Sequence, residues 1–257
     1  MNRLDGRAAD QPRPVEVTTG FQRNAEGSVL YRAGRTVVLC TASVDPTVPP
    51  WMAGKGRGWL TAEYQMHPRS SPTRRESRDG RGKAPSGRTQ EIQRLIGRSL
   101  RAALDLRRLG EMSITIDCDV LEADGGTRTA SITGGFIALA LALSRLHGSG
   151  LLTEPVLRDQ VTAISVGHLE EGLALDLVYT EDSTARVDLN LVATPRGGIV
   201  EVQATAEDEA IPRHEMDRMI DLGFVGVRAL AKTQLEALAH AGVDLPMLFQ
   251  PERWVVL

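Results

Sequence analysis

The sequence predicts an α+β fold in a single domain that spans residues 1–257, with mixed sheets packed against helices. Three observations indicate this fold class. The first quarter and the second half are rich in strand patterns, helical segments lie among them, and no linker marks a domain boundary. The 42% hydrophobic content is ordinary for a globular protein, and 257 residues are enough to bury a sizeable core.

The first quarter of the chain has strand character. Residues 28–44 contain two strand-like runs joined at Ala33-Gly34, which is the signal of a hairpin, and residues 57–66 predict a further short strand. Apolar residues then almost disappear over residues 68–87, where serine, proline, glycine and arginine dominate. We expect a long exposed loop there, and inserts of this length are usually functional or disordered.

The middle of the chain predicts two helices with a strand between them. Ser86 is a suitable N-cap for a helix over residues 88–108, and residues 112–122 alternate apolar and polar in strand fashion. Residues 130–146 form a nearly all-apolar helical segment, in which Gly134 and Gly135 favour close packing against a sheet. The apolar stripe expected on the first helix is Ile92, Leu95, Ile96, Leu100, Ala103 and Leu104.

The second half predicts two hairpins and a terminal helix. The first hairpin turns at Glu171-Gly172, the second turns over residues 196–198, and residues 213–240 have amphipathic helical spacing. The chain has two cysteines, Cys40 and Cys118, each inside an expected strand. We expect both to be buried free thiols in a reducing cytoplasm, although a disulfide stays possible.

Charge is distributed unevenly along the chain. Residues 66–108 hold twelve Lys and Arg against four Asp and Glu, so this segment carries +8, whereas the whole chain carries −3 and the remainder therefore −11. Such a split suggests an anionic partner for the basic segment, and the alternative is two solvated faces of opposite sign. The N-terminus lacks the apolar core of a secretory signal, and no membrane span is expected, so we expect a cytoplasmic protein.

A strand-to-turn-to-helix junction at residues 121–146 predicts an anion site. Helix N-termini present unpaired N–H groups, glycine permits close approach of the backbone, and Thr127 and Arg128 add a hydroxyl and a planar guanidinium. Arg88 stands in a similar place at the start of another helix, so the two arginines could converge on one oxyanion. The alternative is that Arg128 is a helix cap or a surface residue.

Aspartates of the acidic region predict a site for a hard cation. Asp176 and Asp188 alternate with apolar neighbours and are expected on the polar face of their strands, with Asp182 in a turn between them. Clustered carboxylates without cysteine or histidine suit Mg²⁺ or Mn²⁺. The alternative is a solvated hairpin. The scattered histidines do not have zinc-ligand spacing, and P-loop, dinucleotide-binding and serine-hydrolase motifs are absent from the sequence.

The basic loop suits the backbone of a nucleic acid. Its side chains could neutralise phosphates, and no aromatic residue lies between Tyr64 and Phe136 to stack on bases. We therefore expect the loop to hold the backbone and to recognise little sequence. Its cations are Arg69, Arg74, Arg75, Arg78, Arg81 and Lys83.

Six motifs, in order along the chain, together resemble the ribonuclease PH family of phosphorolytic tRNA nucleotidyltransferases, which is related to polynucleotide phosphorylase and the exosome ring subunits. They are "DGR", "GSVLYRAGRTVVLCTASV", "GWLTAEYQMHPR", "SGRTQEIQRLIGRSLRA", "IDCDVLEADGGTRTASITGGF" and "LDLVYTEDSTARVDLNLVAT". The resemblance implies a fold like that of ribosomal protein S5 and a homohexameric ring built as a trimer of dimers. It also implies that inorganic phosphate attacks the 3′ end of tRNA precursors or other RNA and releases nucleoside diphosphates.

The resemblance also implies roles for individual residues. Asp182 and Asp188 match the catalytic, metal-associated aspartates, and the arginines among residues 69–78 match the segment that holds the tRNA acceptor stem. The phosphate-binding residues implied are Arg88, Gly126, Thr127 and Arg128.

The chain departs from the family pattern at a few positions outside these site residues. Ala204 replaces a usual glycine, His67 replaces the leucine of a usual Met-Leu pair, and Arg35 stands where Asp or Asn is frequent. These departures put local loop shape and substrate preference in question, but not the reaction class. Two rival functions remain at this point, a metal-dependent hydrolytic nuclease and a non-catalytic RNA-binding ring subunit.

Overall fold

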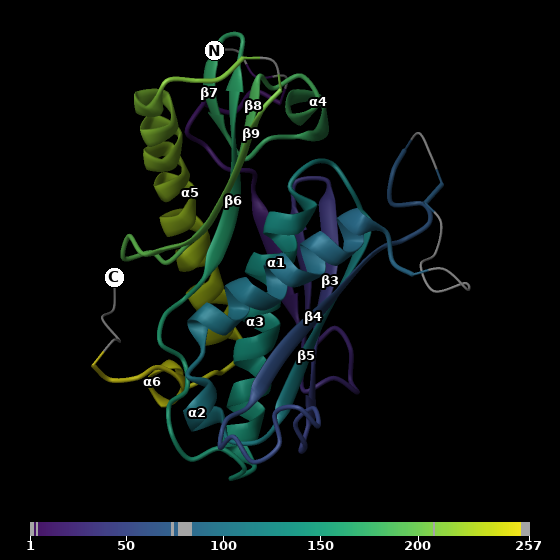
Figure 1. Ribbon diagram of the computed structural model, residues 1–257, viewed down its shortest axis with the longest axis vertical. Helices are drawn as coiled ribbons and strands as arrows, with labels where there is room; N and C mark the ends of the chain where they lie inside the picture. Colours follow the sequence, from purple (N-terminus) through teal and green to yellow (C-terminus); the bar gives the residue numbers. More distant parts are fainter. Residues whose placement is uncertain (1–2, 4, 73–74, 77–83, 208, 253–257) are drawn as a thin grey trace.

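The protein is described by a computed structural model that covers residues 3, 5–72, 75–76, 84–207 and 209–252. Its strands form two sheets, and helices pack on both of them (Figure 1). This architecture confirms the predicted α+β class. The single-domain organisation stays a prediction.

The first sheet holds the strands of the first half of the chain, in the order β1-β2-β3-β5-β4. Neighbouring strands are antiparallel except β4 and β5, which are parallel. The expected hairpin at Ala33-Gly34 joins β2 to β3. The strands are β1 (Val15–Thr19), β2 (Gly27–Ala33), β3 (Thr36–Asp45), β4 (Trp59–Met66) and β5 (Ser113–Glu122).

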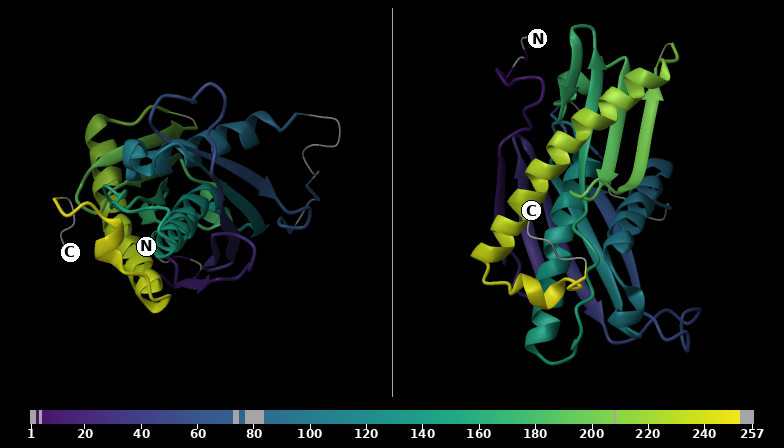
Figure 2. Two further views of the ribbon diagram at one scale, coloured as in Figure 1. Left: turned by 90° about the horizontal axis from the view of Figure 1, so that it is seen from below. Right: turned by 90° about the vertical axis from the view of Figure 1, so that its left-hand side faces the viewer.

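The second sheet is antiparallel throughout, in the order β7-β6-β8-β9. Both hairpins expected in the second half are present. The terminal helix α5 (Arg213–His240) has the predicted bounds and runs obliquely across this sheet (Figure 2). The strands are β6 (Thr162–Leu169), β7 (Gly172–Leu175), β8 (Val187–Ala193) and β9 (Ile199–Ala206), and the short helix α6 (Leu245–Leu248) follows α5.

Helix α1 (Gly87–Ala103) begins as predicted and ends five residues earlier than predicted. The Ser86 hydroxyl caps it by accepting a hydrogen bond from the Thr89 amide at 3.1 Å. The helix stops because Leu104 has an extended backbone and forms a bridge with Leu157. Asp105 then caps a separate short helix, α2 (Leu106–Leu109). All six residues of the predicted apolar stripe are buried.

Helix α3 (Thr127–Gly148) packs on the first sheet and also contacts β6. Its glycine pair permits the close packing expected from the sequence. A Cβ on Gly134 would lie 3.0 Å from the Cβ of Tyr31, and a Cβ on Gly135 would lie 3.3 Å from Ile116. By length and composition α3 is the one helix in the described part of the chain that could cross a membrane, but 83% of its most apolar window is buried inside the protein.

Cys40 and Cys118 face each other across β3 and β5, and both are buried free thiols, as predicted. A hydrogen bond with Cys118, together with burial, raises the pKa of the Cys40 thiol well above its ordinary value. Cys40 therefore stays protonated, and the two buried side chains pack as small apolar groups.

The loop between β4 and α1 is less exposed at its start than predicted. Ser70 is buried, and its carbonyl oxygen accepts a hydrogen bond from the Ala123 amide at 3.0 Å. This bond holds the start of the loop beside the end of β5. No helix or strand occurs in the described residues between β4 and α1, which agrees with the prediction of a loop.

A buried ion pair joins the N-terminal segment to the end of β7. Arg13 Nη2 lies 2.6 Å from Asp176 Oδ1, and Arg13 Nε and its backbone N–H both donate to Oδ2. Asp176 was predicted to lie on the polar face of a strand, and this prediction was wrong. β7 ends at Leu175, and Asp176 turns inward with φ of 55°, the one positive φ outside glycine among the described residues.

The same guanidinium holds the turn that precedes α3. Arg13 Nη1 donates to the carbonyl oxygen of Asp124 at 2.8 Å, and the Thr36 hydroxyl donates to that of Gly125 at 2.7 Å. A Cβ on Gly125 would lie 2.5 Å from the carbonyl oxygen of Leu177, and a Cβ on Gly126 would lie 2.8 Å from Arg13 Nη2. Both glycines also have positive φ, so the turn requires glycine twice.

A second buried pair fixes α4 (Tyr179–Asp182). Arg3 donates to both carboxylate oxygens of Glu181 at 2.8 and 2.6 Å, and also to the carbonyl oxygen of Leu175 at 2.7 Å. Arg3, Arg7 and Arg13 therefore connect the N-terminal segment to the end of β7, to α4 and to the glycine turn. These are the segments that carry Asp182, Thr127 and Arg128.

We predict that Asp176→Asn lowers the free energy of unfolding by about 3–5 kcal/mol, because the substitution leaves the Arg13 charge buried without a counter-ion. Urea unfolding at neutral pH measures this change. The exposed Asp221→Asn provides a matched control and should be near neutral.

The same difference should depend on pH in a defined direction. Burial by itself raises the pKa of Asp176, but Arg13 and then Arg7 together hold it below the ordinary 3.8. A depressed pKa stabilises the fold above that value, and the stabilisation is lost as the pH falls through the folded-state pKa. The wild type and Asp176→Asn should therefore converge in strong acid. A constant difference down to that range would contradict the assignment.

Candidate active site

A cavity of about 740 Å³ lies where the N-termini of α1 and α3 approach α4 and β8. Residues from both sheets and from the start of the basic loop line it. The structure therefore brings together six residues, each of which was predicted from the sequence. They are Arg88, Gly126, Thr127, Arg128, Asp182 and Asp188.

One wall of the cavity is the N-terminus of α3. Gly126 occupies the N-cap position in the left-handed conformation, and no side chain among the described residues caps the helix there. The first N–H groups and the positive end of the helix dipole therefore stay available to an anion. The glycine turn thus provides the approach that the sequence suggested.

Arg128 points across this wall toward β9 and α1. Its Nη1 donates to Gln203 Oε1 at 3.1 Å and lies 3.8 Å from Glu91 Oε1. Arg88 is exposed at the first turn of α1 and lines the same cavity. Arg128 and Arg88 both lower the pKa of Asp182 and of Asp188, so both guanidinium groups act electrostatically on one site. Both arginines thus line one cavity, and their convergence on one oxyanion stays a prediction.

Tyr64 on β4 forms a hydrogen bond with the side chain of Thr127. The Tyr64 hydroxyl and Thr127 Oγ1 are 2.9 Å apart, and Tyr64 is buried. Burial raises the pKa of the phenol above its ordinary value, so it stays protonated at neutral pH. The bond restricts the rotation of the Thr127 hydroxyl at the cavity wall.

The opposite wall carries two carboxylates. Asp182 is the last residue of α4, and Asp188 lies near the start of β8, opposite Thr205 on β9. Burial and then the neighbouring Asp182 charge raise the pKa of Asp188, and Arg128 opposes them, so that the pKa is about 6. Burial likewise raises the pKa of Asp182, and Arg128 and Arg88 oppose this.

Asp188 is only half satisfied by hydrogen bonds. Its Oδ2 accepts from Asn190 Nδ2 at 3.0 Å, whereas its Oδ1 is buried and has no hydrogen-bond partner in the described part of the chain. A buried carboxylate oxygen without a partner costs free energy, so the site suits a cation. Within the described residues no cluster of three or more potential protein ligands surrounds it. Two carboxylates fit a hard divalent ion that takes its other oxygens from water and phosphate.

Several lining residues were missed by sequence analysis. Asn190 lies two positions after Asp188 on the same strand face and pairs in register with Gln203 of β9. Period-two alternation could have identified Asn190, because successive odd or even positions share a face. Glu91, which lines the cavity, and Tyr64, which contacts Thr127, carried no comparable local signal, since their positions depend on how α1 and β4 pack.

The predicted RNA-binding arginines that the structure describes, Arg69 and Arg75, lie outside the cavity lining. Arg69 and Arg75 are exposed, and Arg74 and Arg78 lie outside the described residues. Ser71 and Pro72 do line the cavity, so the basic loop leaves from its rim. Asp176, by contrast, is not part of this site because it pairs with Arg13.

Comparisons with known proteins agree with this geometry. The family models described as "3' exoribonuclease family", domain 1 and domain 2, match residues 11–144 and 159–226. Ribonuclease PH of Maricaulis maris is 54% identical over 236 residues, covering 92% of this chain and 99% of that protein. Ribonuclease PH of Rhodopirellula baltica is 53% identical over 234 residues, covering 89% and 94%.

Solved structures show the same fold at low sequence identity. Rice Rrp46 superposes with a TM-score of 0.74 at 18% identity, covering 92% of this chain and all of that one. A chain of the Archaeoglobus fulgidus exosome gives 0.73 at 22% identity, covering 90% and 92%. Both domain models of the family match, and together they cover most of the chain. This chain therefore belongs to the ribonuclease PH family of 3′ exoribonucleases.

Proposed function

We propose that this protein is a phosphorolytic 3′-to-5′ exoribonuclease that trims tRNA precursors and other RNA. The observation that carries the proposal is the single cavity in which Arg88 and Arg128 face Asp182 and Asp188. Such a cavity suits a reaction between two anions, because it can neutralise charge on both. The matched relatives carry the name ribonuclease PH, which supports the same activity.

The proposed reaction transfers a nucleotidyl group to inorganic phosphate. An oxygen of the phosphate attacks the phosphorus of the 3′-terminal phosphodiester, the bond from that phosphorus to the preceding 3′ oxygen breaks, and this oxygen takes up a proton. The products are a nucleoside 5′-diphosphate and RNA shortened by one nucleotide. Reversal of the same step adds a nucleotide from a diphosphate.

The residues of the cavity contribute mainly position and charge. Arg88, Arg128, the Thr127 hydroxyl and the N–H groups at Gly126 hold the attacking phosphate in line with the terminal phosphodiester. Tyr64 keeps the Thr127 hydroxyl oriented. Neutralising the attacking anion also reduces its repulsion by the RNA backbone.

Asp182 and Asp188 are the proposed ligands of Mg²⁺ or Mn²⁺. The unpaired Oδ1 of Asp188 and the oxygen-only character of the pair support this assignment. A bound divalent ion would offset charge on the scissile phosphate and on the leaving oxygen. Asn190 orients Asp188 by holding its other oxygen.

Assembly and RNA capture extend the proposal. We propose a homohexameric ring built as a trimer of dimers, acting in the cytoplasm. A structural neighbour named "Archaeal exosome core" supports assembly into a larger complex. Arg69, Arg74, Arg75 and Arg78 are proposed to hold the tRNA acceptor stem through its phosphates. The position of the loop start at the cavity rim supports this role.

Product analysis tests the reaction class directly. A tRNA with a short 3′ extension should be shortened only when inorganic phosphate is present, and the released nucleotides should be 5′-diphosphates. Chromatography of the released nucleotides with and without phosphate measures this outcome. Monophosphates released without phosphate would instead identify a hydrolytic nuclease, and no release under either condition would identify a non-catalytic RNA-binding subunit.

We predict that Arg128→Ala raises the KM for phosphate by about 10- to 100-fold, because a charge-assisted hydrogen bond contributes about 1.5–3 kcal/mol. Steady-state diphosphate release at varied phosphate concentrations measures this change. Arg145→Ala is the matched control, since Arg145 is exposed at the far end of the same helix. An unchanged KM in Arg128→Ala would refute the phosphate assignment.

We predict that Mn²⁺ affinity falls below about pH 6, because protonation of Asp188 competes with metal binding. The loss should approach tenfold per pH unit if one proton is displaced. Since the Asn190 hydrogen bond lowers the pKa of Asp188, Asn190→Ala should move the fall to higher pH. Paramagnetic titration of free Mn²⁺ from pH 5 to pH 8 measures both curves. Asp188→Asn should remove this pH dependence, and its persistence there would contradict the assignment.

A further inference from the structure

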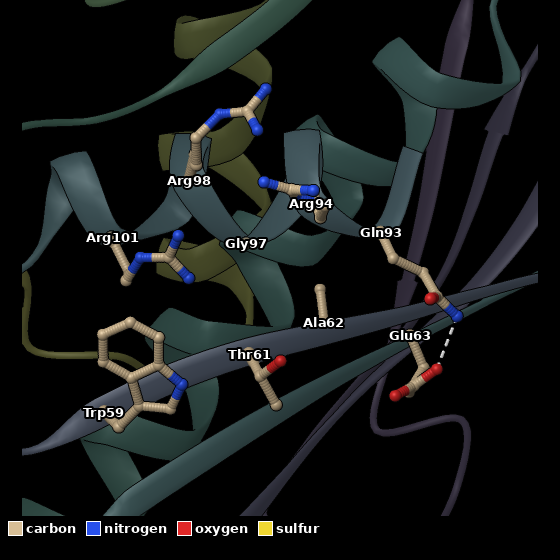
Figure 3. A pocket seen from close by; sticks show the side chains of 9 residues that line it. All are labelled: Trp59, Thr61, Ala62, Glu63, Gln93, Arg94, Gly97, Arg98 and Arg101. Carbon is tan, nitrogen blue, oxygen red and sulfur yellow. Dashed lines mark hydrogen bonds between the residues drawn. The ribbon is translucent and has the colours of Figure 1, made fainter. Parts of the chain in front are cut away.

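A second cleft lies on the outer face of α1 and β4, away from the cavity described above (Figure 3). Its volume is about 350 Å³. β4 forms its floor, Arg94 and Arg101 of α1 flank Gly97 above that floor, and Arg98 at its edge extends away from β4. The lining residues are Trp59, Thr61, Ala62, Glu63, Gln93, Arg94, Gly97, Arg98 and Arg101.

Helical spacing places the three arginines around one gap. Arg94, Arg98 and Arg101 are four and three residues apart, so they share a face of α1. Gly97 lies among them and keeps the floor open. A Cβ there would lie 3.1 Å from Arg101 Nη1 and 3.6 Å from the backbone nitrogen of Ala62. A compact anion could therefore reach several guanidinium groups at once.

Part of this cleft is held in place before any ligand binds. Arg101 lies 4.6 Å from the Trp59 ring centroid, and its Nη1 donates to the carbonyl oxygen of Leu60 at 2.9 Å. Arg98 forms two hydrogen bonds with Glu201, at 3.1 and 2.7 Å. Arg94 is exposed and has no hydrogen-bond or ion-pair partner in the described chain. One cation is thus free, and a second is fixed by stacking.

Exposed aromatic surface adjoins the arginines. The Trp51 and Trp59 rings meet edge to face with centroids 4.8 Å apart, and Trp51 is 55% exposed. Lys55 lies 5.8 Å from the centroid of the Trp51 ring. Arginines beside an exposed aromatic ring are the combination by which proteins bind single-stranded nucleic acid, through phosphates and base stacking.

Helix α1 connects this cleft to the first cavity. Arg88 at its start lines the cavity, and Arg101 lies thirteen residues further along the helix, which is about 20 Å at 1.5 Å per residue. At 3.6 residues per turn, Arg94, Arg98 and Arg101 share a face that lies about a third of a turn around the helix axis from Arg88. A single strand whose 3′ end occupies the cavity would pass around α1 to reach this face.

We propose that the cleft is a second phosphate subsite, which binds a backbone phosphodiester of single-stranded RNA upstream of the reacting 3′ end, with Trp51 as a stacking surface. The inference rests on the proposed function, because it requires RNA in the first cavity. Glu63 is held by a hydrogen bond from Gln93 at the far end of the cleft and limits the net positive charge. The subsite therefore suits one phosphodiester, not a highly charged polyanion.

The test compares RNA of two lengths on the full-length protein. A trinucleotide is too short to span from the cavity to the cleft, whereas a single-stranded decanucleotide is long enough. We expect Arg94→Glu to weaken decanucleotide binding at least tenfold and to leave trinucleotide binding and the KM for phosphate unchanged. Fluorescence anisotropy at several salt concentrations measures the affinities, and the salt slope for the decanucleotide should decrease.

Two further variants sharpen the comparison. Trp51→Ala should weaken decanucleotide binding several-fold through lost stacking. Arg107→Glu is the matched control, since Arg107 is exposed on α2 outside the cleft, and it should change neither affinity by more than about twofold. Circular dichroism of each variant verifies folding.

The outcomes separate this inference from the proposed function. Equal losses for both RNA lengths, or none in Arg94→Glu, would overturn the subsite. A change in oligomer mass in Arg94→Glu with unchanged RNA affinity would also overturn it and would identify the cleft as a contact between copies of this chain. Failure of the wild type to release diphosphates from RNA would refute the proposed function whatever these affinities show.

Discussion

The buried ion pair between Arg13 and Asp176 is the interaction on which the site depends. One guanidinium holds the carboxylate at the end of β7 and the carbonyl oxygen of Asp124 in the turn before α3. Asp176 directly follows β7 of the second sheet and Asp124 follows β5 of the first sheet, so the pair connects the segments that leave the two sheets. Removing one partner of such a pair is costly, although the pair itself need not add net stability. We assign it the role of fixing position.

The site is built by distributing charge over two walls. The wall formed by α1 and α3 presents arginines and N–H groups, whereas the wall formed by α4 and β8 presents two carboxylates. Burial raises the pKa of both carboxylates, and the arginines opposite oppose that shift. The two walls therefore stabilise each other electrostatically even before a ligand arrives, and each keeps capacity for an ion of opposite sign.

Glycine decides how closely these elements approach. Gly125 and Gly126 adopt positive φ and leave no room for a Cβ, which places the start of α3 directly against the segment leading into α4. Gly134 and Gly135 allow the body of α3 to lie close to the first sheet and to α1, because neither has a Cβ. These close contacts fix the position of the α3 N-terminus, whose first residues line the cavity.

Much of this protein followed from local sequence patterns. Period-two alternation predicted β5, helical spacing predicted α5, and the motifs identified Arg88, Arg128, Asp182 and Asp188 as the candidate site. Local signals failed where a competing contact lay far along the chain. Leu104 fits the helical spacing, but it forms a β-bridge with Leu157, so α1 ends before the predicted residue.

Asp176 and Asp188 show the limit most clearly. Both alternate with apolar neighbours, yet Asp188 lines the cavity while Asp176 binds Arg13, which is 163 positions away. The sequence by itself determined most of the strands and helices, the family motifs and the types of charge available. Only the tertiary structure decided which charges share a cavity, because pairing between distant groups depends on the packing of the two sheets and not on the spacing of neighbours along one strand.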